Sequence, residues 1–199
     1  MMFFRFFVLV FSFLLLACGQ KSECSFENID FREGDLIFRK GTGTKSRAVI
    51  YADSLSIYSH VGIVVLRDSA FQVVHITPGE RENGETEDRI KAEPVTDFWR
   101  KNRASHGAVY RLENDSWSKK ASEQALRLLQ KSVLFDHNYT LNDTTEMYCT
   151  EFVHYVYEKA GKDISFGRRS EFNIPKYTGS YILPSDIYAN DAFILVYKF

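Results

Sequence analysis

The stretch His60-Val61-Gly62-Ile63-Val64-Val65-Leu66, followed after a polar triplet by Phe71-Gln72-Val73-Val74-His75-Ile76, decides the fold of this chain. The first run is apolar and β-branched, which predicts a buried strand over residues 60–66. The triplet predicts a turn, so the second run should pair back on the first as a hairpin. Residues at the start of one strand and the end of the next are neighbours in a tight hairpin. We therefore expect His75 to lie beside His60.

Shorter elements are predicted on both sides of this hairpin. The patterns indicate strands over residues 35–39, 108–112 and 192–197, and short helices over residues 45–52 and 95–100. The charged stretch 80–88 is interpreted as a solvated loop with little intrinsic order. Strands that arrive as a cluster, with helices interspersed rather than strictly alternating, predict an α+β fold with a mainly antiparallel sheet packed against helices.

Two longer helices follow in the second half of the chain. The first has Asp115 or Ser116 as its expected cap and a shared apolar face made of Trp117, Ala121, Ala125, Leu128, Leu129 and Val133. The second follows Tyr148 and is ended by Gly161. Its apolar face consists of Cys149, Phe152, Val153, Val156 and Ala160.

Composition narrows the class of protein. The chain has 199 residues, of which 45% are apolar, with 25 Lys and Arg against 26 Asp and Glu. This length suits one domain with a real core, and the near-neutral balance argues against nucleic-acid binding, which normally needs a basic excess. Three cysteines are too few for a disulfide scaffold, so each requires its own explanation.

The amino terminus has the pattern of a targeting segment. Residues 3–17 are apolar except for Arg5 and Ser12, and they are fewer than the about 20 residues that a spanning helix needs. A basic residue, a short apolar run and a small residue at its end are typical of a secretory signal. Leu15-Leu16-Ala17-Cys18 resembles the bacterial lipobox, in which the cysteine is lipidated and becomes the first mature residue.

This resemblance implies a lipoprotein signal over residues 1–17, a lipidated Cys18 with a polar tether over residues 18–29, and a folded domain over residues 30–199. The lipid would hold the protein on a membrane of the bacterial cell envelope. An ordinary signal peptide or a short membrane anchor is the alternative. Cys24 lies in the tether and has no predicted partner.

Cys149, His60 and His75 are the candidate chemical residues. Cys149 begins a predicted helix, where free backbone N–H groups and the helix dipole favour a thiolate. A cysteine facing a histidine that is held by a second polar side chain is the arrangement for nucleophilic acyl transfer. The alternatives are an inert core cysteine, a structural histidine, or a zinc site, for which no CxxC or HxxxH spacing is present. The other histidines, His106, His137 and His154, are interpreted as surface or structural residues.

Four strings extend this interpretation. Residues 34–38 (GDLIF), 59–64 (SHVGIV), 74–75 (VH) and 148–153 (YCTEFV) resemble motifs of the NlpC-type cysteine peptidase superfamily. In ordinary members the cysteine helix precedes the histidine strand, whereas here it follows. That order resembles the circularly permuted, papain-like branch of YiiX/YaeF-like amidases, which is related to the lecithin–retinol acyltransferase group. Residues 184–188 (PSDIY) also resemble this branch, and the resemblance covers about residues 30–190.

The resemblance implies a permuted papain-like fold with the nucleophile at a helix amino terminus, and it assigns roles. Cys149 would be the nucleophile, His60 the general base that later protonates the leaving group, and His75 the residue that orients the imidazole. Closer relatives tend to carry Glu at the position of His75, and a neutral histidine holds an imidazolium less strongly than a carboxylate would. Tyr148 and Glu151 are candidate supporting residues, although a solvated helix position is the favoured interpretation of Glu151. No metal or organic cofactor is required.

Three functions follow from these observations. The first is a cysteine amidase or peptidase that cleaves cell-wall peptide bonds through a thioester, because an envelope lipoprotein is positioned for peptidoglycan. The second is acyl transfer or hydrolysis on lipids or acyl amides, since relatives with the same triad act on acyl chains. The third is a non-catalytic envelope-binding domain, against which the intact Cys149, His60 and His75 argue.

Overall fold

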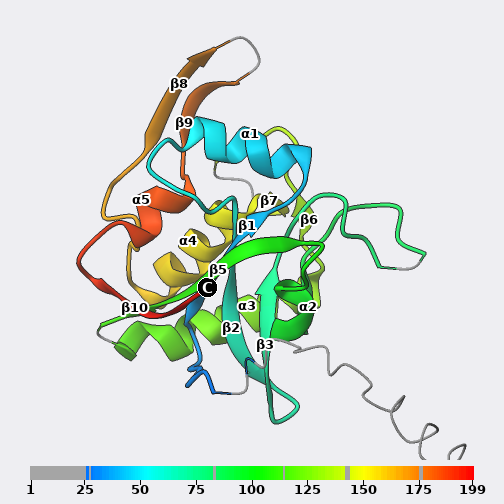
Figure 1. The fold of residues 1–199 in the computed structure, drawn as a ribbon, viewed down its shortest axis with the longest axis vertical. Coiled ribbons are helices and arrows are strands. Elements are labelled where there is room, and N and C mark those ends of the chain that lie inside the picture. Colours follow the sequence, from blue (N-terminus) through cyan, green and yellow to red (C-terminus); the bar gives the residue numbers. More distant parts are fainter. Residues whose placement is uncertain (1–25, 27, 83, 114, 142–143, 175–176) are drawn as a thin grey trace, which may run out of the picture.

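The computed structural model describes residues 26, 28–82, 84–113, 115–141, 144–174 and 177–199 (Figure 1). The predicted signal 1–17, Cys18, Cys24 and all but the end of the predicted tether lie outside these residues. Within the described part of the chain, no helix has the length and apolar character needed to cross a membrane.

A six-stranded antiparallel sheet forms the centre of the molecule, with the strand order β10-β5-β1-β2-β3-β4. The predicted hairpin forms β2 and β3 of this sheet, with Ile63 opposite Val74 and Leu66 opposite Phe71. The α+β class and the antiparallel sheet are thereby confirmed. The strands are β1 (Leu36–Gly41), β2 (His60–Arg67), β3 (Ala70–His75), β4 (Lys91–Pro94), β5 (Ala104–Leu112) and β10 (Phe193–Lys198).

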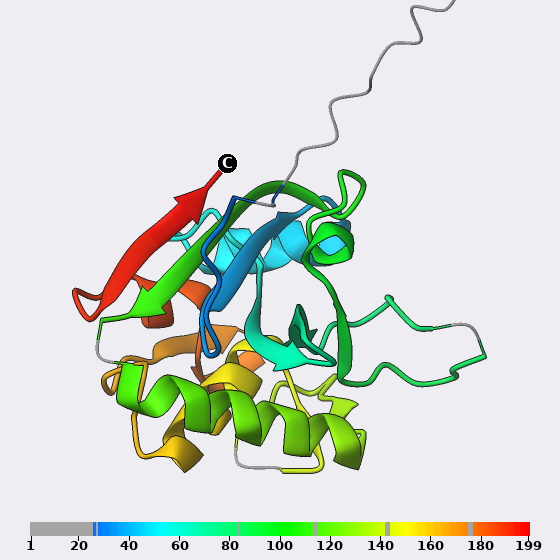
Figure 2. The same ribbon diagram turned by 90° about the horizontal axis from the view of Figure 1, so that it is seen from below.

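Both faces of the sheet are covered, because successive side chains of a strand point to opposite faces. Two helices, α3 (Ser118–Lys131) and α4 (Cys149–Ala160), pack against one face (Figure 2). Their predicted apolar faces meet alternate strand residues in the main core, which includes Phe38, Ile63, Val74, Ala125, Phe152 and Val156. The opposite face packs against α2 (Val95–Phe98) and the first described residues, with Ile37, Val64, Val73, Phe98 and Trp99 buried there.

Several smaller elements surround the sheet and the layers that cover its two faces. The helix predicted over residues 45–52 is α1 (Thr44–Ala52). It lies at the same end of the molecule as the hairpin of β8 and β9, which the sequence did not predict (Figure 1). The remaining elements are the parallel pair β6 (Leu134–Phe135) and β7 (Glu146–Met147), the hairpin β8 (Ser170–Ile174) and β9 (Tyr177–Tyr181), α5 (Pro184–Tyr188), and a 3-10 turn over Asp115–Trp117.

One local prediction is wrong, and another is confirmed. Asp115 and Ser116 do not cap α3, because the chain is already in the 3-10 turn at these residues and Trp117 is the N-cap. The stretch 80–88 is a loop in its described residues, most of which are exposed, and charged side chains anchor both of its ends. Glu80 forms an ion pair with the buried Arg39 at 2.5 Å, and the buried Asp88 accepts a hydrogen bond from Arg81 at 2.8 Å.

Candidate active site

The structure brings the two predicted histidines together. His60 begins β2 and His75 ends β3, and Nε2 of His60 lies 2.9 Å from Nδ1 of His75. Both side chains are buried, at 5% and 0% exposure. Gly62 makes this packing possible, since a Cβ at that position would lie only 3.0 Å from Cβ of His75. The ring of Phe98 packs against both imidazoles, with its centroid 5.6 Å from that of His60 and 5.1 Å from that of His75.

A carboxylate that the sequence did not reveal lies behind His75. Oε1 of Glu93 is 3.0 Å from Nε2 of His75, and the Glu93 side chain is 11% exposed. Glu93 belongs to β4, which pairs with β3 so that Lys91 lies opposite His75. The four residues of β4 carry no clear strand pattern, so only the pairing itself identifies this carboxylate as a neighbour of the histidine.

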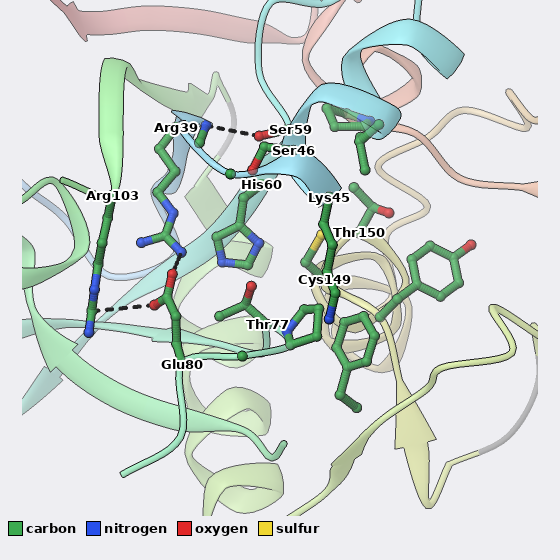
Figure 3. Close-up of a pocket in the computed structure, with 18 of the residues that line it drawn as sticks. Arg39, Lys45, Ser46, Ser59, His60, Thr77, Glu80, Arg103, Cys149 and Thr150 are labelled. Carbon is green, nitrogen blue, oxygen red and sulfur yellow. Dashed lines mark hydrogen bonds and ion pairs between the residues drawn. The ribbon is translucent and has the colours of Figure 1, made fainter. Parts of the chain in front are cut away.

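The carboxylate fixes the direction of the hydrogen bonds. Burial alone would raise the pKa of Glu93, but the hydrogen bond from His75 and the charge of Lys91 outweigh burial and hold this pKa well below its usual range. An ionised carboxylate only accepts hydrogen bonds, so Nε2 of His75 donates and Nδ1 of His75 accepts from Nε2 of His60. The remaining ring nitrogen of His60, Nδ1, is therefore an acceptor, and Figure 3 shows the His60 ring pointing toward Cys149.

Cys149 is the first residue of α4 and is half-buried. Burial raises the pKa of its thiol to about 11, and hydrogen bonds from the backbone N–H groups of Val61 and Thr150 offset this only in part. The prediction that the helix start favours a resting thiolate is therefore wrong, because desolvation outweighs the helix terminus. Burial and the charge of Arg39 also lower the pKa of His60 well below 6.5. The resting pair is a neutral thiol beside a neutral imidazole.

Glu151 and Tyr148 hold the start of α4 in place. Glu151 is only 6% exposed, so the interpretation as a solvated helix residue is wrong. Its Oε2 accepts a hydrogen bond from the backbone N–H of Tyr148 at 3.4 Å and caps the helix. The Tyr148 hydroxyl accepts a bond from the backbone N–H of Ile182 at 3.0 Å, and the Thr150 hydroxyl donates to the Ile182 carbonyl. These bonds fix the chain between β9 and α5.

A pocket of about 380 Å³ opens over Cys149 and His60 (Figure 3). Its walls come from the chain between β1 and α1, from residues 77–80 after β3, and from residues 181–184 before α5. The other histidines do not line it. His106 and His137 are exposed, and His154 is buried with Nε2 2.9 Å from Asp163, in line with their predicted surface or structural roles.

Ionic groups surround His75 on the side away from Cys149. Ligand atoms of His75, Glu80 and Glu93 lie within 4.8 Å of one another, which is a spacing that a metal ion could use. Both carboxylates are, however, already paired with cations. Glu80 pairs with Arg39, Lys91 and Arg103, and Glu93 pairs with Lys91 and Arg103. A metal here would have to displace these cations and the His75–Glu93 hydrogen bond, so the donor set does not fit one.

Residues 30–180 match the model of the permuted papain-like amidase enzymes of the YaeF/YiiX type, the C92 family. The chain belongs to this family. It is therefore a papain-like cysteine amidase at the level of the family, and the third function considered from the sequence, a non-catalytic binding domain, is set aside.

One solved structure supports the fold of this permuted papain-like amidase. The crystal structure of metalloprotein YiiX from Escherichia coli O157:H7 is similar with a TM-score of 0.65 and 21% sequence identity, over 84% of this chain and 97% of that one. At this identity the likeness concerns the fold, and it confirms the permuted papain-like architecture. No curated protein matches the chain.

Proposed function

We propose that this amidase hydrolyses its substrate through a thioester on Cys149, with His60 as general base and His75 and Glu93 as the residues that orient it. The observation that carries this proposal is the continuous set of hydrogen bonds from Glu93 through His75 to His60. It leaves one acceptor nitrogen, Nδ1 of His60, on the side of the ring that faces Cys149 (Figure 3).

In the acylation step the Cys149 thiol gives its proton to Nδ1 of His60 as Sγ attacks the substrate carbonyl carbon. A carbon–sulfur bond forms, and the carbonyl π electrons move onto oxygen. The backbone N–H of Cys149, at the start of α4, is the proposed donor to this oxyanion; one such donor lowers a barrier by about 3 kcal/mol in other enzymes. When the intermediate collapses, the carbon–nitrogen bond breaks, and His60 gives the proton to the leaving amine.

In the deacylation step water replaces the amine. His60 takes a proton from water as its oxygen attacks the thioester carbon, and the carbon–sulfur bond then breaks. Cys149 leaves as a thiolate, recovers the proton from His60, and the acid product departs. His75 and Glu93 stabilise the imidazolium that forms in each step. His75 supplies the hydrogen bond to that ring, and Glu93 supplies the negative charge behind it.

The proposed substrate is a peptide amide of the cell wall. This part of the proposal rests on the lipobox-like residues 15–18, because a protein anchored at an envelope membrane through Cys18 is positioned for peptidoglycan. A Cys18→Ser variant tests the anchor. We expect the variant to leave the membrane fraction, whereas retention in that fraction would contradict lipidation at Cys18.

The mechanism has no step that uses a metal ion. The similar protein YiiX from Escherichia coli O157:H7 is described as a metalloprotein. In this chain, the candidate ligands Glu80 and Glu93 are paired with Arg39, Lys91 and Arg103, and His75 is held by Glu93. We propose that these groups act as an ion-pair network that holds the base.

The test compares the mature protein with its Cys149→Ala variant on three substrates. These are muropeptides, phospholipid vesicles and N-acyl amides, with products identified by mass spectrometry. We expect Cys149-dependent cleavage of amide bonds in muropeptides. Cleavage confined to lipids or acyl amides would favour the second function. No Cys149-dependent product from any of the three would contradict the proposed function.

A further inference from the structure

The charged residues that line the pocket are not all paired. Three of them, Arg39, Glu80 and Arg103, form ion pairs with one another, with Glu80 lying 2.5 Å from Arg39 and 3.3 Å from Arg103. The fourth, Lys45, has no ion-pair partner among the described residues. The pocket therefore presents one uncompensated ammonium group.

Lys45 is placed where a bound substrate would meet it. It lies in the first turn of α1, which contains no acidic residue, and its side chain is exposed. Lys45 and Cys149 line the same pocket, and Figure 3 shows the Lys45 side chain pointing into the pocket from the wall formed by α1. A substrate whose carbonyl carbon reaches Cys149 would thus pass beside this ammonium.

We infer that Lys45 binds a carboxylate of the substrate close to the scissile amide. This inference rests on the proposed function and narrows its substrate to acidic peptides. A carboxylate is the anionic group that a peptide substrate can carry next to its amide bonds. Arg39 and Arg103 are already ion-paired with Glu80, so among the described residues Lys45 is the lining cation that has no ion-pair partner, and its ammonium can pair with one carboxylate.

Peptides that differ only in this charge provide the test. Each N-acetylated peptide is made with Glu and with Gln at the same position, next to the scissile bond on either side, and kcat/KM is measured by mass spectrometry. We expect the wild-type protein to prefer the Glu peptide of one such pair by about tenfold, with the preference shrinking as salt screens the charges. The Lys45→Met variant should cleave the two peptides equally, and Lys45→Glu should prefer Gln.

Arg47 supplies the matched control. It lies on the same helix and is exposed, but it does not line the pocket. Arg47→Met should keep the wild-type preference for the Glu peptide. A preference that survives in Lys45→Met, or that is lost equally in Arg47→Met, would overturn the inference.

The result for the neutral peptide separates this inference from the proposed function. Cys149-dependent cleavage of Glu and Gln peptides at equal rates by the wild-type protein would overturn the role of Lys45 and leave the hydrolase intact. If the wild-type protein cleaves no peptide at all, the proposed function fails and the role of Lys45 fails with it.

Discussion

Nε2 of His75 lies 3.0 Å from Oε1 of Glu93, and this contact places a carboxylate behind the proposed triad, whose third member is an imidazole. A neutral histidine alone would hold the His60 imidazolium weakly. Glu93 strengthens this interaction, because it fixes which ring nitrogens of the two histidines carry protons and places a negative charge behind His75. In the proposed mechanism Glu93 is a positioning residue, since it acts on Cys149 only through the two histidines.

Replacing Glu93 by Gln should lower kcat by about 100-fold or more with little change in KM. The Gln amide can donate to Nε2 of His75, which would reverse the hydrogen bonds and put a proton on the His60 nitrogen that faces Cys149; a wrong tautomer costs about 10⁴-fold in kcat in a serine protease. Steady-state kinetics with the best peptide substrate measures the effect.

Two further variants make this prediction specific. Glu93→Asp keeps an ionised acceptor and should recover part of the activity. Glu80→Gln also removes a carboxylate that pairs with Arg39, Lys91 and Arg103, but Glu80 does not bond to His75. Its effect on kcat should be smaller. Equal losses in the Glu80 and Glu93 variants would show that only the charge of the network matters, against the orienting role of Glu93.

The buried histidines should make the protein less stable in acid. Burial lowers the pKa of His75 from 6.5 to about 4. Between these two values the unfolded chain binds the proton and the folded protein does not, so stability falls as pH decreases through this window. For His75 the full loss is of the order of 3 kcal/mol. Thermal unfolding from pH 7 to pH 4 should show this decline, and His75→Gln should flatten it. If stability declines just as steeply with decreasing pH in this variant, the decline does not arise from His75.

Alkylation should report the resting state of Cys149. Because burial raises its pKa to about 11, the thiol is protonated at neutral pH, and its reaction with iodoacetamide should be slow at pH 7 and rise toward pH 11. Mass spectrometry of the peptide that contains Cys149 measures the rate. A rate that is already maximal near pH 6 would mean a resting thiolate and would contradict the neutral thiol–imidazole pair.

Chelation should leave the activity unchanged. The carboxylates of Glu80 and Glu93 are paired with Arg39, Lys91 and Arg103, and no step of the proposed mechanism passes through a metal ion. Incubation with EDTA followed by gel filtration should preserve kcat/KM, with metal content measured on the same sample. Loss of activity that returns on adding one divalent metal would contradict this arrangement of the site.

The sequence predicts those parts of the site that depend on local pattern. The β-branched run at residues 60–66 and its hairpin partner place His60 beside His75, and the apolar face of α4 places Cys149 at a helix start. Glu93 and Lys45 could not be predicted in this way. Glu93 reaches His75 only through the pairing of the short β4 with β3, and Lys45 reaches the pocket through the path of the chain between β1 and α1.

The electrostatic properties of the site could not be predicted from the sequence either, because they depend on burial. A helix start alone favours a thiolate at Cys149, yet desolvation in the folded protein raises its pKa. The sequence predicts that Glu151 is solvated, yet in the structure it is buried and caps α4. In both residues the three-dimensional packing decides the outcome.

The most direct test of the central claim is to trap the acyl-enzyme. The mature protein is mixed with its best peptide substrate, quenched in acid within a turnover, and analysed by intact and peptide mass spectrometry. We predict an added mass equal to the acyl part of the substrate, located on Cys149 and absent from Cys149→Ala. Turnover without such an adduct, an adduct on another residue, or equal turnover by Cys149→Ala would contradict the thioester mechanism.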